Sequence, residues 1–377
     1  MSLAFKLASQ NLFHDRLRFI ATIVGIVFSI VLVTVQMGLY VSFDRMVTTM
    51  IDHTPADLWI VPLGTKCFED PSLLDERERF RALSVGGVTD VRPLVIGFAQ
   101  WKTPAGGTTP VFIIGSDTKA EGLRPWNLVE GSFGALEIPG TVVADQSYLD
   151  RLGIAGSGAS AEIGGQNVRV AGLTKGIRSF TTTPYIFTAL DRARSYTGTS
   201  PAKASYLLVR VAPDADIASV GRRLQQTLSG TEVLTPGEFR SRSPSFWLSG
   251  TGAGAALFAG ALLGIVVGTV IVAQTLYSST KDHLNEFATL RAMGSSGLYI
   301  HKVIVFQALL SAAIGFAIAA SIGLVIVDAT TETALPVVVP PALLLILFVL
   351  TIIMCALSAI SAIVQVIRID PAMAFTR

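Results

Sequence analysis

Four long stretches of the sequence contain no Asp, Glu, Lys or Arg. A charged side chain at the centre of a bilayer costs about 2.5–3.5 kcal/mol on the insertion scale, so such gaps are typical of membrane spans. Each stretch is longer than the roughly 20 residues that an α-helix needs to cross the hydrocarbon core. The sequence therefore predicts four transmembrane helices, within residues 19–43, 243–280, 303–327 and 333–367.

Basic residues are distributed unequally between the two sides of these spans. Residues 1–18 and 281–302 each contain Lys and Arg, whereas residues 328–340 contain neither. Cytoplasmic loops are enriched in Lys and Arg, so we expect both termini and the 281–302 loop to be cytoplasmic. Residues 44–242 then lie on the opposite side of the membrane.

Residues 44–242 differ in character from the rest of the chain. They hold 21 Lys+Arg and 21 Asp+Glu, an ordinary charge density for a soluble domain, although the whole chain is 51% hydrophobic and only 15% charged. Short β-type runs alternate with helical ones, which predicts an α+β domain or two small α+β lobes. The expected strands are 91–101 with 109–115, a hairpin of 161–163 with 167–171, and 141–144, 184–187 and 205–211; the expected helices are 73–83, 146–152 and 217–228.

Together these patterns predict a membrane protein with an α-helical bundle of four transmembrane helices and a large α+β extracytoplasmic domain between the first and second. The predicted segments are a cytoplasmic or interfacial N-terminal helix (1–18), the first span (19–43), the extracytoplasmic domain with stalk segments (44–246), the second span (247–279), a cytoplasmic loop (280–302), the third span (303–327), a short outer loop (328–340), the fourth span (341–367) and a cytoplasmic tail (368–377).

The first span is expected to continue outward as a helix. Tyr40, Phe43, Val47 and Met50 follow one another at spacings of three and four, which places them on one helix face. The second uncharged stretch is also longer than the bilayer requires, so it could supply the facing half of a helical stalk. The alternative is an ordinary helix overhang followed by a linker at residues 240–254.

Small residues recur along one face of two spans. Such ridges allow another helix to approach closely, either in a dimer or within one four-helix bundle, and both alternatives stay open. The ridge of the second span comprises Gly252, Ala256, Gly260, Gly264 and Gly268, and that of the third comprises Ser311, Gly315, Ala319 and Gly323.

Several function classes find no support in the sequence. The spans lack the ionisable residues that would mark ion coupling, and the net charge of +2 is too small for the broad basic surface of a nucleic-acid binder. No phosphate-binding loop of the G-x-x-x-x-G-K-[ST] type occurs, and the four histidines are dispersed. We therefore expect no catalytic, metal or cofactor-binding residues, and we interpret the charged run 69–81 as a solvated helix face.

The cytoplasmic loop carries the most specific signal. Leu284, Phe287, Leu290 and Met293 recur every three residues and form an apolar stripe on a predicted helix that ends at Gly294. Such a stripe suits either insertion into a groove of a partner protein or a position at the membrane interface.

This loop resembles the coupling helix of ABC permeases of the MacB/FtsX superfamily. The similarity is carried by residues 286–294 (Glu-Phe-Ala-Thr-Leu-Arg-Ala-Met-Gly), by residues 299–304 that enter the next span, and by the tail 368–374 (Arg-Ile-Asp-Pro-Ala-Met-Ala). One helix, a large outer domain and three further helices is also the arrangement of these permeases. Residues 56–61 (Ala-Asp-Leu-Trp-Ile-Val) and 101–104 (Trp-Lys-Thr-Pro) are most similar to DevC-like permeases, which act in export of glycolipids or other envelope molecules.

The resemblance implies a homodimeric permease in the bacterial inner membrane, with two copies of a separate ABC ATPase bound beneath it. ATP and Mg would then bind to the partner ATPase and not to this chain. It also implies a periplasmic adaptor (membrane fusion protein) and a TolC-type outer-membrane channel as partners, besides membrane lipid. The residues implied in ATPase coupling are Leu284, Glu286, Phe287, Leu290, Arg291, Met293 and Gly294.

The leading hypothesis is a non-catalytic permease subunit that uses ATP hydrolysis on its partner to move the periplasmic domain and export an amphiphile or envelope molecule. The alternative is an FtsX-like regulator of a periplasmic cell-wall hydrolase, whose coupling loop would look the same. A membrane-embedded enzyme is a third class, which no catalytic constellation supports.

Overall fold

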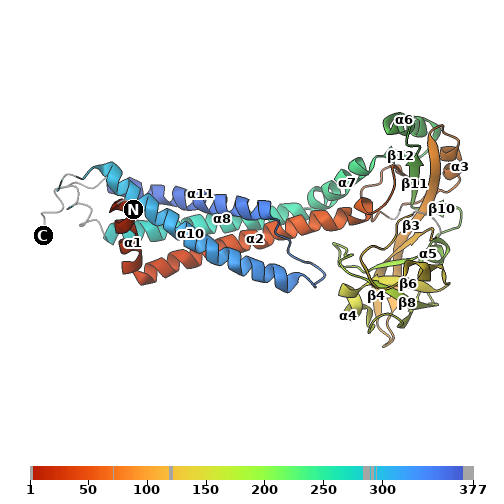
Figure 1. Ribbon diagram of the computed structural model, residues 1–377, viewed down its shortest axis with the longest axis horizontal. Coiled ribbons are helices and arrows are strands. Elements are labelled where there is room, and N and C mark those ends of the chain that lie inside the picture. The colour runs from red at the N-terminus through yellow and green to blue at the C-terminus, as the bar shows by residue number, and fades with distance from the viewer. Residues whose placement is uncertain are drawn as a thin grey trace. The chain divides into compact units, whose positions relative to one another are not determined.

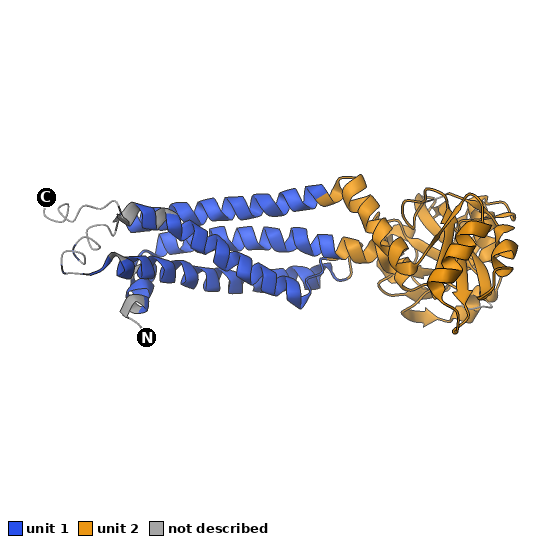
Figure 2. Cartoon of the chain, turned by 90° about the horizontal axis from the view of Figure 1, so that it is seen from above, with its two compact units in different colours: residues 1–41, 255–331, 337–377 blue, residues 42–254, 332–336 orange. Residues whose placement is uncertain are grey.

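The computed structural model describes residues 3–70, 72–118, 122–282, 289, 293 and 295–367. The chain divides into two compact units (Figure 2). Unit 1 comprises residues 1–41, 255–331 and 337–377, and unit 2 comprises residues 42–254 and 332–336.

Unit 1 is α-helical, and in Figure 1 its long helices run alongside one another. Within the described residues, four helices are long and apolar enough to cross a membrane: Arg16–Asp52, Ala253–Lys281, Leu298–Thr330 and Pro341–Ile360. The helices that contribute to unit 1 are α1 (Leu3–His14), α2 (Arg16–Asp52), α8 (Ala253–Asp282), α10 (Gly297–Thr330) and α11 (Pro341–Ile367).

Unit 2 is built on a ten-stranded mixed sheet, which confirms the α+β prediction. The strands lie in the order β12-β1-β11-β3-β4-β9-β6-β8-β5, and β7 pairs with both β3 and β8. The strands are β1 (Leu58–Pro62), β3 (Val88–Lys102), β4 (Thr108–Ser116), β5 (Leu128–Gly131), β6 (Thr141–Asp145), β7 (Ser160–Ile163), β8 (Gln166–Thr174), β9 (Tyr185–Ala189), β11 (Tyr206–Val211) and β12 (Thr231–Leu234), with β2 (Leu74–Asp75) and β10 (Lys203–Ala204) as a separate pair.

The long strand β3 connects the two parts of this sheet. Its first half pairs with β11 and its second half with β4, in both cases antiparallel. Because β7 bridges β3 and β8, strands β3, β4, β9, β6, β8 and β7 close a ring. Trp101 is buried in the core of this ring, where its indole Nε1 donates to the carbonyl oxygen of Leu152 at 3.0 Å.

Short helices complete unit 2. The β12-β1-β11 part is covered by α3 and α6, whose Ala82, Val220 and Leu224 are buried against Leu58, Ile60 and Leu207 of the strands. The helical elements are α3 (Glu78–Leu83), η1 (Phe133–Glu137), η2 (Gln146–Tyr148), α4 (Leu149–Leu152), α5 (Leu190–Thr197), α6 (Ile217–Thr227), α7 (Pro236–Pro244) and the π-helical turn η3 (Ser245–Gly250).

The predicted strands of unit 2 are confirmed to within a few residues, and the errors arise where an element depends on pairing with a distant segment. The predicted helix 73–83 is wrong over its first half, because Leu74 and Asp75 pair with β10 and the helix α3 begins only at Glu78. Strands β1, β2, β5, β10 and β12 and helices α5 and α7 were not predicted from the sequence. These strands are short, and β1 and β12 pair with each other across the chain.

The charged run 69–81 is not one solvated helix face. Glu78 is buried, and the Glu76 carboxylate forms an ion pair with Arg194 of α5. The previous interpretation is therefore wrong for these residues, because tertiary contacts take their side chains out of solvent.

Candidate functional site

The predicted coupling segment lies between the end of α8 at Asp282 and the start of α10 at Gly297. Of its residues, Met293 is described and its side chain is 72% exposed. The others lie outside the described residues: Leu284, Glu286, Phe287, Leu290, Arg291 and Gly294. The site is therefore built from the elements on both sides of this segment.

The N-terminal helix α1 packs against the start of α10. Ala8 and Val303 are buried against each other, with Leu7, Tyr299 and Phe306 around them. The Phe5 ring adds an edge-to-face contact with Phe306 of α10, with ring centroids 6.0 Å apart. The first turns of α10, directly after the coupling segment, are thereby held by a second helix.

Helix α2 packs closely against α8 through the predicted small-residue ridge. The Ser29 hydroxyl donates to the carbonyl oxygen of Gly264 at 2.7 Å. A Cβ at Gly260 would lie 2.6 Å from the Gln36 amide nitrogen, and one at Gly268 would overlap Ser29. These three glycines therefore serve helix packing within one chain. Gly252 precedes the first residue of α8, and Ala256 is exposed.

The ridge of α10 also faces α2. A Cβ at Gly315 would lie 2.5 Å from Ile26, and one at Gly323 would lie 3.3 Å from Thr34. Two further members of the ridge, Ser311 and Ala319, are fully buried. One helix, α2, thus contacts both small-residue ridges within the chain; the structure contains one copy, so the dimer role of these residues stays a prediction.

The predicted stalk residues lie on a helix that is continuous from Arg16 to Asp52. In unit 1, the Tyr40 ring lies 4.9 Å from that of Phe258. In unit 2, the ring centroids of Phe43 and Phe180 are 3.7 Å apart. Further along, Val47 is buried, and Met50 is part of the main core together with Trp59, Phe112 and Tyr206. The last turns of α2 are therefore anchored in the core of unit 2.

The second half of the expected stalk is not a continuous helix. Helix α7 ends at Pro244, the π-helical turn η3 follows, and Gly252 adopts φ +77° before α8 begins. A positive φ is readily adopted by glycine and strained for other residues. Helix α7 is not continuous with α8, but it forms an ion pair with α2, in which Arg240 Nε lies 3.1 Å from Asp52 Oδ1. This ion pair has no signature in the sequence, because its two residues are far apart in the chain.

The start of α7 is fixed by a reciprocal capping box. The Thr235 hydroxyl accepts from the backbone N–H of Glu238, and the Glu238 carboxylate accepts from the backbone N–H of Thr235 at 2.7 Å. These hydrogen bonds from the Thr235 backbone and hydroxyl lower the pKa of Glu238.

Among the described residues, no group of three His, Cys, Asp or Glu is placed to hold a metal ion.

Two family models match the chain, one after the other along the sequence. Residues 19–227 match the model of the MacB-like periplasmic core domain, and residues 258–371 match that of the FtsX-like permease C-terminal region. No curated protein matches the chain.

Two solved structures are similar to parts of the chain. The periplasmic region of MacB from Actinobacillus actinomycetemcomitans is 10% identical, with 51% of this chain and 94% of that one covered and a TM-score of 0.39. The extracellular domain of the ABC-type transporter YknZ from Gram-positive bacteria is 16% identical, with 48% of this chain and 99% of that one covered and a TM-score of 0.34.

The family assignment rests on the two sequence models, because the first alone covers more than half of the chain. Together with the four helices that can span a membrane, they identify a multi-pass membrane protein. The chain belongs to the MacB/FtsX-like family of ABC-transporter permeases.

Proposed function

We propose that this chain is the mechanical subunit of an ABC exporter, in which ATP and Mg bind to a separate ATPase and drive motion of the extracytoplasmic domain. The observation that carries this proposal is the continuity of α2. The helix packs against the ridges of α8 and α10 in unit 1, and its last turns are buried in the core of unit 2. A displacement of the helix at one end is therefore transmitted along its axis to the other.

The coupling segment is proposed to receive the input from the ATPase. Its apolar stripe suits insertion of a helix into a groove on the partner. It follows α8 and precedes α10, and both of these helices contact α2 through glycines. Movement of the segment would therefore reach α2 through close helix contacts, in which the glycines of α8 and α10 lie directly against side chains of α2.

The assembly proposed on family grounds contains two copies of the chain and two of the ATPase, in the inner membrane with the chain termini in the cytoplasm. A periplasmic adaptor and an outer-membrane channel of the TolC type would complete an export path for an amphiphile or envelope molecule. The chain itself is proposed to catalyse no covalent reaction.

The test is affinity purification of the full-length chain in mild detergent, followed by mass spectrometry and an ATPase assay. We expect an ABC ATPase in the complex, with activity that is lost in Leu290→Asp and kept in Glu137→Gln, a substitution at an exposed position of unit 2. Co-purification of an adaptor supports export, whereas co-purification of a cell-wall hydrolase contradicts it and favours the regulatory alternative. A folded, monodisperse sample without any ATPase in several detergents would overturn the proposal.

A further inference from the structure

Unit 2 contains a cavity of about 270 Å³ that the family assignment leaves without a role. It lies between the segment that follows β1, the facing strands β3 and β4, and the turn η3. This volume is near the lower end of the range of small-molecule sites, and it exceeds the roughly 150 Å³ that holds a benzene molecule. The residues that line it are Lys66, Cys67, Glu69, Asp70, Phe98, Phe112, Ser179, Thr181, Phe246 and Trp247.

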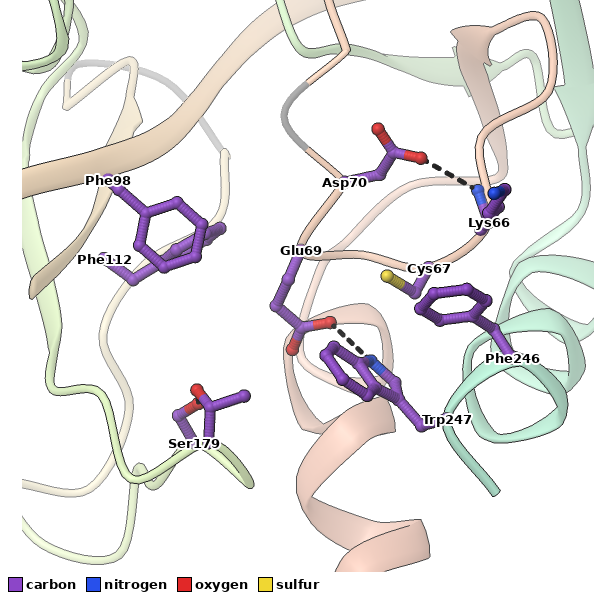
Figure 3. Close-up of a pocket in the computed structure, with 10 residues that line it drawn as sticks. Lys66, Cys67, Glu69, Asp70, Phe98, Phe112, Ser179, Phe246 and Trp247 are labelled. Atoms are coloured by element: carbon purple, nitrogen blue, oxygen red, sulfur yellow. Dashed lines mark hydrogen bonds between the residues drawn. The ribbon is translucent and has the colours of Figure 1, made fainter. Parts of the chain in front are cut away.

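Aromatic rings form two walls of the cavity (Figure 3). Phe98 and Phe112 lie on one side, with ring centroids 4.8 Å apart and an interplanar angle of 81°. Phe246 and Trp247 lie on the other side, with centroids 5.3 Å apart. Phe98 is 55% exposed although it is a large apolar residue, so its ring is available to a ligand. Aromatic faces carry negative electrostatic potential and attract cations.

A carboxyl group lies between these walls. In Figure 3 the Glu69 side chain points toward Trp247, and the indole Nε1 donates to Glu69 Oε2 at 3.4 Å. The Tyr185 hydroxyl donates to the other oxygen, Oε1, at 2.9 Å. The backbone N–H of Glu69 and the Cys67 thiol also donate to this carboxyl group. No ion pair to Glu69 exists among the residues that the structure describes.

The cavity holds two carboxyl groups and one ammonium group. Burial raises the pKa of Glu69, and a cation bound beside it would lower that pKa again by stabilising the carboxylate. Asp70 is ionised, because hydrogen bonds from Ser72 and the Lys66 backbone outweigh its desolvation and lower its pKa. The only basic side chain of the lining, Lys66, has an exposed ammonium group 5.8 Å from the centre of the Phe246 ring. Cys67 stays a neutral thiol, since burial and the nearby Glu69 raise its pKa to about 12. A partly buried carboxylate without a counter-cation beside aromatic faces is complementary to an organic cation.

We propose that this cavity binds a small organic cation, an ammonium group with an apolar or aromatic substituent, with the charge at Glu69 and the substituent between Phe98 and Trp247. An anionic ligand would meet two carboxyl groups and one exposed ammonium group. A neutral ligand would give no stabilisation to the ionised form of Glu69. The site lies wholly in unit 2, so the proposal is independent of the partner ATPase and of what the transporter moves.

The test uses titration calorimetry on the full-length chain in a non-ionic detergent, at neutral pH. The probe is benzyltrimethylammonium, and 3-phenylpropan-1-ol and 3-phenylpropionate serve as neutral and anionic ligands of similar size. We expect the cation to bind at least about tenfold more tightly than the alcohol, which corresponds to one charge-assisted contact. Equal affinity of cation and alcohol, or tighter binding of the anion, would overturn the proposal.

Two variants locate the site. Glu69→Gln keeps the size of the side chain and removes its charge, so cation affinity should fall about tenfold, whereas the exposed Glu137→Gln should leave it unchanged. Phe98→Leu keeps an apolar side chain at a half-exposed position and removes the ring. It should weaken binding of the cation and of the alcohol alike, because the phenyl group of each lies against Phe98, whereas Glu69→Gln should weaken binding of the cation alone. If a folded Phe98→Leu protein and a folded Glu69→Gln protein both bind the cation as the unmodified chain does, the cavity is not the site.

Discussion

The Ser29 hydroxyl donates a hydrogen bond to the carbonyl oxygen of Gly264, at 2.7 Å, and thereby joins α2 to α8 at their small-residue contact. One helical turn further along α8, a Cβ at Gly268 would overlap the Ser29 side chain. We expect Gly268→Val to force the two helices apart and to destabilise unit 1 by about 1–3 kcal/mol, the usual cost of overpacking. Thermal unfolding in detergent should show a lower midpoint. The same increase in size at exposed Ala259, in Ala259→Val, should leave the midpoint unchanged; an equal loss in both variants would contradict close packing at Gly268.

Interrupting α2 should uncouple transport from ATP hydrolysis. A seven-residue Gly/Ser insertion after Val41 removes helical continuity at the boundary between the two units. A seven-residue Ala/Glu/Lys insertion at the same place adds close to two helical turns and keeps the faces nearly in phase. We expect the flexible insertion to abolish substrate export while ATPase binding persists, and the helical insertion to retain export. Equal export by both insertion variants would rule out transmission through a rigid α2.

The coupling segment should be sensitive to charge. Leu290→Asp places a carboxylate in the proposed apolar contact with the ATPase, and Glu286→Lys reverses a charge beside it. Both variants should lose stimulation of the partner ATPase, while the thermal transition of unit 2 stays at its original temperature. Full stimulation and full transport in both variants would show that the ATPase binds elsewhere.

The capping box of α7 predicts both a stability change and its pH dependence. Thr235→Ala removes the hydroxyl that accepts from the Glu238 backbone, and we expect a loss of about 1 kcal/mol. The pKa of Glu238 is lowered in the folded protein by hydrogen bonds from Thr235, so its contribution is present at neutral pH. It should disappear as the pH falls below the ordinary glutamate value of about 4.3 and through the lowered pKa.

Comparing thermal midpoints of the unmodified chain and Glu238→Gln between pH 3 and 7 checks this sign. The difference should favour the unmodified chain at pH 7 and shrink on acidification. A difference that grows at low pH would contradict the assignment.

Glu69 should show the opposite dependence. Burial raises its pKa in the folded protein, against the hydrogen bonds from Tyr185 and Trp247 that lower it. The folded state therefore binds this proton more tightly than the unfolded state, and stability is lost as the pH rises from about 4.3 through the raised pKa. The ionisable groups near Glu69 are Lys66, Cys67, Asp70, Tyr185 and Tyr206.

The difference in midpoint between Glu69→Gln and the unmodified chain isolates this effect from the other carboxyl groups. Glu69→Gln should gain stability relative to the unmodified chain as the pH rises. A difference that is constant from pH 4 to 8 would show that the pKa of Glu69 is not raised.

The sequence by itself determined the membrane spans and the class of the protein. Absence of charge over residues 19–43 or 303–327 reflects a cost that each side chain incurs from the bilayer alone, whatever its neighbours. The hairpin of β7 and β8 was also predictable from local sequence, because its turn glycines Gly164 and Gly165 are adjacent in the chain and both adopt positive φ. The family signature in the coupling segment is likewise contiguous.

Only the tertiary structure decided which partners those local elements find. The glycine ridge of α8 was compatible with a dimer or with a bundle, and the contact of Gly264 with Ser29 showed packing within the chain. In the sequence, Glu69 is one of several charged residues in a polar run. In the structure, its carboxyl group accepts hydrogen bonds from Tyr185 and Trp247, which come from two distant segments. Local sequence patterns reflect the free energy of placing each side chain in water or lipid and the backbone preference of each residue, and both act on residues one at a time. Contacts between residues more than 100 positions apart depend on the register of a closed sheet and on helix packing, and these are properties of the whole chain.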